Sequence, residues 1–215
     1  MNKIYKVFPG GKFKVLTFSY DDGKIEDRRL VKLFNKYNLK ATFNLNTGII
    51  DPAIRIPQEE WPELYAGHDI AVHTFTHPTM IRLNDYAVIR EILEDKNNLE
   101  KIFHRPITGF AYPNGSFDSR IVDIAKSVGI KYARVTNDRY AATKAAENYA
   151  SSADGPIPIG DENGFFMPDD YMRWVPTCHH NHNLIDFGKK FMALTKKQYL
   201  YMMYVWGHSY EFERN

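Results

Sequence analysis

The sequence has very little cysteine and no long apolar run. Cys178 is the only cysteine among 215 residues, so an intramolecular disulfide and a cysteine-based metal site are both excluded. No stretch reaches the length of a membrane span, and the first fifteen residues lack the continuous apolar segment of a signal peptide. We therefore expect a cytoplasmic protein with no membrane partner, or an extracellular one if a signal segment has been removed.

An excess of charge of either sign is also missing. The 28 lysines and arginines nearly balance the 26 aspartates and glutamates, and the basic residues are scattered, so no nucleic-acid partner is expected. Aromatic residues are plentiful, with 14 Tyr, 14 Phe and 3 Trp available for a core or for stacking on sugars. The length suits one well-filled core, which predicts a single domain over residues 1–215.

The most informative stretch is a strand that ends at two carboxylates. Residues 15–18 have the apolar character of a buried strand, and Asp21, Asp22 and Gly23 follow. Two adjacent acids at the end of a buried strand repel each other and lose hydration. They usually need a cation, or a division of labour between a ligand and a base. The alternative is ordinary turn chemistry, because Asp and Gly favour turns.

Strand-like and helix-like segments alternate along the chain. Helices are expected at 25–37, 58–66, 84–104, 118–128 and 184–194, and further strands at 41–46, 69–73, 108–112, 131–135, 171–175 and 199–206. This order predicts a parallel sheet or an α/β barrel with its site at the carboxyl ends of the strands. One rim would then hold Asp21, Asp22, His73, Tyr112 and Arg134.

Two longer segments need separate expectations. The helix at 84–104 has Asn84 as a plausible N-cap. Its predicted apolar side holds Ile89, Ile92, Leu93, Leu99 and Phe103. Residues 136–170 are rich in Ala and then in Gly, Pro, Asp and Asn, which is typical of a substrate-binding excursion or lid, or of a disordered loop.

His73 and His77 lie four residues apart. On a straight strand they would be about 13 Å from each other, too far for one metal ion with bonds of about 2.0–2.1 Å. The chain must therefore curl here if both rings bind the same ion. Taken alone, the pair is also compatible with two ordinary histidines. With Asp22 it would form a two-histidine, one-carboxylate site that leaves a position open for water.

Four motifs together resemble the polysaccharide deacetylases, the NodB-like carbohydrate esterases. They are S-Y-D-D-G at 19–23, H-T-F-T-H at 73–77, A-Y-P-N-G at 111–115 and W-G-H-S-Y at 206–210, and the resemblance covers 15–210. It implies a distorted (β/α) barrel of about seven strands. It also implies hydrolysis of an acetyl group from an N-acetylated carbohydrate by a divalent metal, usually zinc, with cobalt, nickel or manganese as alternatives.

The resemblance also implies roles for individual residues. Asp21 corresponds to the general base, and His208 to the general acid that protonates the leaving amine. Asp22, His73 and His77 correspond to the metal ligands, while the backbone N–H of Asn114 would help the metal hold the oxyanion. Residues expected to line the sugar site are Tyr112, Pro113, Trp174 and Trp206, although the aromatic rings could equally belong to the core.

Three departures from the family pattern leave alternatives open. Ala111 stands where the family has an Arg that pairs with the catalytic Asp, and we hypothesise that Arg134 supplies this guanidinium from a neighbouring strand. The usual Asp-rich fourth motif is not visible. The chain also ends soon after His208, so the barrel could be incomplete there, or its edge covered by a partner chain in a homo-oligomer.

The remaining alternatives concern the role of residues 178–182 and the type of reaction. Residues 178–182 contain three histidines and a cysteine, and are expected to form a polar loop with at most one histidine reaching the site. Other candidates on the same scaffold are an O-acetyl esterase, a cyclic-amide hydrolase or a catalytically silent sugar-binding relative. A two-histidine, one-carboxylate iron oxygenase would leave Asp21 and His208 without an evident task.

Overall fold

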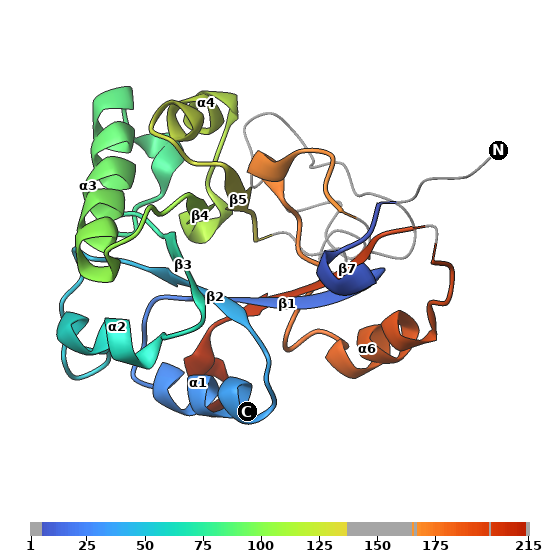
Figure 1. The fold of residues 1–215 in the computed structure, drawn as a ribbon. Coiled ribbons are helices and arrows are strands. Elements are labelled where there is room, and N and C mark those ends of the chain that lie inside the picture. Colours follow the sequence, from blue (N-terminus) through green and yellow to red (C-terminus); the bar gives the residue numbers. More distant parts are fainter. Residues whose placement is uncertain (1–5, 137–164, 166, 198, 214–215) are drawn as a thin grey trace.

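Seven parallel strands form one curled sheet (Figure 1). The computed structural model describes residues 6–136, 165, 167–197 and 199–213. The strands are β1 (Lys14–Asp21), β2 (Ala41–Leu45), β3 (Asp69–Val72), β4 (Gly109–Ala111), β5 (Tyr132–Arg134), β6 (Cys178–His179) and β7 (Tyr201–Gly207), in the order β5-β4-β3-β2-β1-β7-β6. The fold is a distorted, incomplete (β/α) barrel, as the sequence predicts.

Helices follow most strands and bury one face against the sheet. They are α1 (Asp27–Lys36), α2 (Trp61–Leu64), α3 (Asp85–Phe103), α4 (Ser119–Ser127) and α6 (Leu184–Ala193), with 3-10 turns at η1 (Pro9–Gly11), η2 (Gln58–Glu60), η3 (Met80–Arg82), η4 (Pro113–Gly115), η5 (Tyr171–Arg173) and η6 (Ser209–Glu213). Side-chain caps set two helix starts. The Asn84 side chain accepts from the Ala87 N–H, and Asp118 accepts from the Ile121 N–H.

The buried side of α3 differs from the predicted one. Ile92 and Leu99 are buried, but Ile89 and Leu93 are each 37% exposed. Val88, Glu91 and Asp95 occupy the buried side instead, together with Ile92 and Leu99. The prediction is confirmed for Ile92 and Leu99 and wrong for Ile89 and Leu93, because an apolar pattern does not reveal buried acids whose hydrogen-bond partners lie in other loops.

The segment predicted as a strand at 171–175 is a 3-10 turn followed by one paired residue. Asp170 caps this turn, η5, by accepting from the Met172 N–H. Trp174 then forms an isolated parallel bridge with Arg134 at the outer edge of β5. Four residues later the chain pairs with β7 as β6, so this segment joins the two edges of the curled sheet.

The run 178–182 also departs from its prediction as a polar loop. Cys178 and His179 form β6, and both are buried, as is His180. The excursion predicted for 136–170 lies largely outside the described residues, which omit 137–164 and 166. In the described ranges, no helix has the length and apolar character needed to cross a bilayer.

Candidate active site

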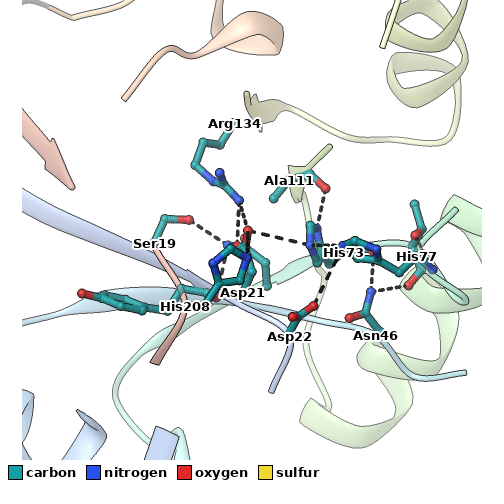
Figure 2. Close-up of polar contacts among 12 residues, drawn as sticks. Ser19, Asp21, Asp22, Asn46, His73, His77, Ala111, Arg134 and His208 are labelled. Atoms are coloured by element: carbon teal, nitrogen blue, oxygen red, sulfur yellow. Dashed lines mark hydrogen bonds and ion pairs between the residues drawn. The ribbon is translucent and has the colours of Figure 1, made fainter. Parts of the chain in front are cut away.

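The two adjacent acids at the end of β1 have different surroundings (Figure 2). Asp21 is the last residue of β1 and is only 2% exposed. Asp22 follows with φ = 84°, a left-handed conformation that is costly for a residue with a Cβ. Arg55 donates to the Asp22 carbonyl oxygen, and its Nη2 lies 3.7 Å from Asp22 Oδ1. The left-handed conformation at Asp22 separates the two carboxylates, so that Asp22 lies near Arg55 while Asp21 has a different cationic partner.

Arg134 is the partner of Asp21. Its Nη2 lies 2.7 Å from Oδ1 and 2.5 Å from Oδ2, and Asn44 donates to Oδ1 at 2.7 Å. Burial alone would raise the pKa of Asp21, but the positive charge of Arg134, followed by smaller effects of His73 and His208, lowers that pKa to about 2. Asp21 is therefore ionised at neutral pH.

The chain after β3 makes the curl that the histidine spacing requires. Thr74 and His77 have φ values of 65° and 57°, and the His77 N–H donates to Thr74 Oγ1 at 3.1 Å. The Nε2 atoms of His73 and His77 come within 3.1 Å of each other. Asn46 holds the start of this turn by donating to the carbonyl oxygens of His73 and Thr74. Positive φ is unusual for a β-branched residue, and strain of this kind clusters at functional sites.

Two buried acids of α3 hold the same turn from outside. Asp95 accepts from the His73 N–H at 3.0 Å and from both the N–H and the hydroxyl of Thr47, at 2.7 and 2.8 Å. Glu91, one helical turn earlier, accepts from the N–H and the hydroxyl of Thr76, each at 2.7 Å. These bonds tie the β2 and β3 loops to one rigid helix.

The tautomer of His73 follows from its hydrogen bond. Its Nδ1–H donates to the Ala111 carbonyl oxygen at 2.8 Å, which leaves the lone pair on Nε2 pointing toward His77. Burial lowers the pKa of His73 to about 4, so its ring is neutral at pH 7. This contact uses the main chain of Ala111, so it is independent of the side chain at this position.

The three predicted ligands fit a divalent metal ion. One ligand atom from each of Asp22, His73 and His77 lies within 4.8 Å of the others. The Nε2 separation of 3.1 Å is close to the roughly 3.3 Å expected between two nitrogens on one tetrahedral zinc ion. The Nε2 lone pair of His73 is thus turned toward the point where the His77 ring and the Asp22 carboxylate meet. The donor set suits zinc and related transition metals.

His208 follows β7 and faces Asp21 from the side opposite the histidine turn. Its Nε2 lies 3.9 Å from Asp21 Oδ2, while His73 Nε2 lies 3.8 Å from the same oxygen. Burial lowers the pKa of His208, but the carboxylates of Glu211 and Asp21 outweigh burial and raise it. A raised pKa favours the protonated ring near neutral pH.

The other predicted site residues divide between core and rim. Tyr112 and Pro113 are buried, and the Tyr112 ring packs on Phe110 and Phe117, so this ring is part of the core and not a sugar-stacking surface. Trp174 and Trp206 are half-buried. The Arg134 guanidinium lies 4.7 Å from the centre of the Trp206 ring. Asn114 is exposed in η4 with φ = 55°, and no main-chain hydrogen bond to its N–H is present among the described residues.

Comparison with known proteins gives the family. The family model described as polysaccharide deacetylase matches residues 9–133, more than half of the chain. The chain belongs to the polysaccharide deacetylase family. The match ends just before Arg134 and does not include His208, so the roles of these two residues depend on the geometry above.

Individual relatives of this family are distant. A chitin deacetylase from Cryptococcus neoformans is 26% identical over 117 residues, 54% of this chain and 24% of the relative. The Streptococcus pyogenes deacetylase PplD, solved in complex with acetate, is 25% identical with a TM-score of 0.57, covering 60% of this chain and 58% of that one. A Bacillus cereus polysaccharide deacetylase shares the fold at 21% identity and a TM-score of 0.57, covering 80% and 50%. The chain spans only 24% to 50% of the curated relatives it matches.

Sequence reasoning missed the residues that support this candidate site. Asn44 lies in β2, where asparagine is unfavourable, and Asn46 follows the end of this strand; the side chains of both donate to residues of the site. Glu91 and Asp95 stand four apart on the buried side of α3. In both elements the available signal was a polar residue at a position that the pattern assigns to the core.

Proposed function

We propose that this chain hydrolyses acetyl groups from an N-acetylated carbohydrate with the help of a divalent metal. The observation behind this proposal is the position of Asp21 Oδ2, 3.8 Å from His73 Nε2 and 3.9 Å from His208 Nε2. An ionised carboxylate thus lies between a metal-binding triad and a histidine with a raised pKa. Hydrolysis of an amide needs a base and an acid on opposite sides of the reacting carbon, together with an electrophile.

In this mechanism the chain's own residues move two protons. Arg134 keeps Asp21 ionised. Asp21 accepts a proton from the attacking water while the water oxygen forms a bond to the acetyl carbon. His208 then gives its Nε2 proton to the sugar nitrogen as the C–N bond breaks. The products are acetate and a free amine; Asp21 then gives its proton to solvent and His208 takes one up, which restores the starting protonation state of both residues. Arg134 and Asn44 hold the Asp21 carboxylate in place throughout.

Asp22, His73 and His77 would hold the metal, with Asp95 and Asn46 fixing the turn that presents the histidines. When bound, a divalent ion lowers the pKa of water and polarises the acetyl carbonyl. The Asn114 N–H, in the loop after β4, would donate to the oxyanion of the tetrahedral intermediate. Family membership and the acetate bound to PplD both support an acetyl substrate.

The test is acetate release from chitooligosaccharides, peptidoglycan fragments and acetylated xylan. Metal-stripped protein is compared with protein reloaded with zinc, cobalt or nickel. Asp21→Asn should keep the metal and lose roughly 10²- to 10⁴-fold of the rate, because it removes a general base. The matched control is Asp123→Asn, at an exposed position on α4.

Each outcome points to one conclusion. Metal-dependent release that is lost in Asp21→Asn supports the proposal and begins to identify the sugar. Release from acetylated xylan alone would indicate an O-acetyl esterase. A protein that binds one metal per chain yet releases no acetate would refute deacetylation, and the search would turn to other amides.

A further inference from the structure

A second cluster of histidines, formed by His179, His180 and His208, surrounds the Glu211 carboxylate. Glu211 Oε2 lies 3.1 Å from His179 Nε2, 3.1 Å from His180 Nε2 and 3.3 Å from His208 Nδ1. The same oxygen accepts the main-chain N–H of His208 at 2.9 Å. Three rings from β6, the end of β7 and the loop between β6 and α6 thus converge on one carboxylate oxygen.

His179, His180 and Glu211 have the composition of a metal site, but the hydrogen bond to His179 Nδ1 argues against metal binding there. The Asn181 N–H donates to His179 Nδ1 at 3.2 Å, so Nδ1 is an acceptor and the ring proton of neutral His179 lies on Nε2. That proton points at Glu211 and occupies the atom that a metal would need. His179 is therefore a donor that neutralises the carboxylate.

His180 is held in the same cluster by tight packing. Its ring stacks on Tyr20 and Phe212, and its Nδ1 lies 3.2 Å from the Tyr20 hydroxyl. A Cβ at position 207 would come within 2.3 Å of this Nδ1, so only glycine leaves room for the ring. The His180 ring beside Glu211 is thus held in place by its neighbours.

We propose that Glu211 is a positioning residue that orients the His208 ring and holds a proton on its Nδ1, leaving Nε2 to face Asp21 and the leaving group. Among the described residues, no hydrogen bond of good angle engages His208 Nδ1, and its one ionic contact is with Glu211. This inference rests on the proposed function of His208 as the acid. The simpler role of Glu211 is to cap η6, because its contact with the His208 N–H resembles a capping box.

The negative charge of Glu211 should raise the pKa of His208. The groups in contact with His208 are Asp21, Glu211, His179 and the rings of Trp206 and Tyr210. Asp22 and His180 act on its charge electrostatically. The His179, His180 and His208 contacts lower the pKa of Glu211 despite its burial, so it stays ionised. An ionised Glu211 stabilises the protonated His208 ring and raises its pKa.

Glu211→Gln separates the two roles. Glutamine can still accept the His208 N–H, so a capping role survives, but the charge is lost. The pKa of His208 should then fall, and the alkaline limb of kcat/KM should move to lower pH. We expect a loss of about 10-fold at pH 8 and under about threefold at pH 6, less than for removal of a general acid. Glu211→Asp should recover part of the loss, and Glu213→Gln, at an exposed position in the same turn, should show none.

NMR of the zinc-loaded protein tests the inference without any substrate. The His208 signals are assigned by their absence in His208→Gln. A lower His208 pKa in Glu211→Gln supports the proposal whether or not a substrate is found, so its failure is separate from failure of the proposed function. An unchanged pKa would overturn it. If Glu211→Gln does not fold, the nitrogen-15 shifts of the wild type decide: an Nε2–H tautomer of neutral His208 would refute the proposal.

A metal titration excludes the other interpretation of the cluster. After dialysis against zinc, wild type and Glu211→Gln should each retain one zinc ion per chain. Two ions in the wild type and one in Glu211→Gln would show that Glu211 is a metal ligand, and would overturn the positioning role.

Discussion

Arg134 at the end of β5 donates to Asp21 at the end of β1, although three strands lie between them in the sheet. In a flat sheet with strands about 4.8 Å apart, these residues would be roughly 19 Å from each other. The contact of 2.7 Å exists only because the sheet curls into a partial barrel. The curl therefore brings a buried carboxylate and its cation together from opposite sides of one rim.

Removal of Arg134 should lower both stability and rate. In Arg134→Ala the buried Asp21 charge is left without its cation, which costs about 3–5 kcal/mol of unfolding free energy. Urea denaturation measures this loss. Arg28→Ala breaks the exposed pair with Glu60 and should cost under about 1 kcal/mol. If Arg134→Ala hydrolyses substrate at the wild-type rate, Arg134 does not supply the missing guanidinium.

Loss of a predicted ligand should be visible in metal content. His77→Gln removes one of the two facing Nε2 atoms, so zinc affinity should fall by more than the roughly 10- to 100-fold expected for an outer residue. Zinc per chain after dialysis, measured by mass spectrometry, checks this. The exposed His104→Gln should retain the wild-type metal content. Full zinc retention in His77→Gln would exclude His77 as a ligand.

Asp95 should influence metal binding without touching the metal. Asp95→Asn places an amide group among three donors, so at least one hydrogen bond to Thr47 or His73 is lost and the turn loosens. We expect zinc affinity to fall about 10- to 100-fold in a chelator competition assay. Asp123→Asn on α4 is the control. Unchanged affinity in a folded Asp95→Asn protein would contradict this positioning role.

Asp27 should make stability depend on pH. Burial raises its pKa to about 7, although the Tyr65 hydroxyl donates to Oδ2 at 2.7 Å. An acid whose folded pKa exceeds its unfolded value binds protons more tightly when folded, so stability falls as pH rises from about 4 to 7. The loss from this group approaches roughly 4 kcal/mol.

Asp27→Asn should remove this pH dependence. Unfolding free energies at pH 5 and pH 8 should then differ less than in the wild type, with the gain seen at pH 8. The exposed Asp186→Asn should follow the wild-type profile. Equal pH slopes in wild type and Asp27→Asn would show that Asp27 is not protonated in the folded protein at pH 5.

The motifs and the alternation of elements were readable from the chain. Residues 41–46, 69–73 and 131–135 were predicted as strands, and β2, β3 and β5 lie within them. The predictions failed where long-range contacts decide. The strand expected at 171–175 pairs through Trp174 alone, and the run expected as a polar loop at 178–182 contains β6. Neither segment has a periodic pattern long enough to reveal its pairing partner.

The motifs, the expectation of a parallel sheet or barrel and the residue types of a two-histidine, one-carboxylate site could all be read from the sequence. These depend on local pattern and spacing, which the chain expresses directly. Three contacts became visible only in the folded protein: Arg134 with Asp21, Asp95 with the His73 turn, and Glu211 with three histidines. Such contacts join residues from different elements, and their distances depend on the curl of the sheet and the packing of helices, which no local pattern encodes.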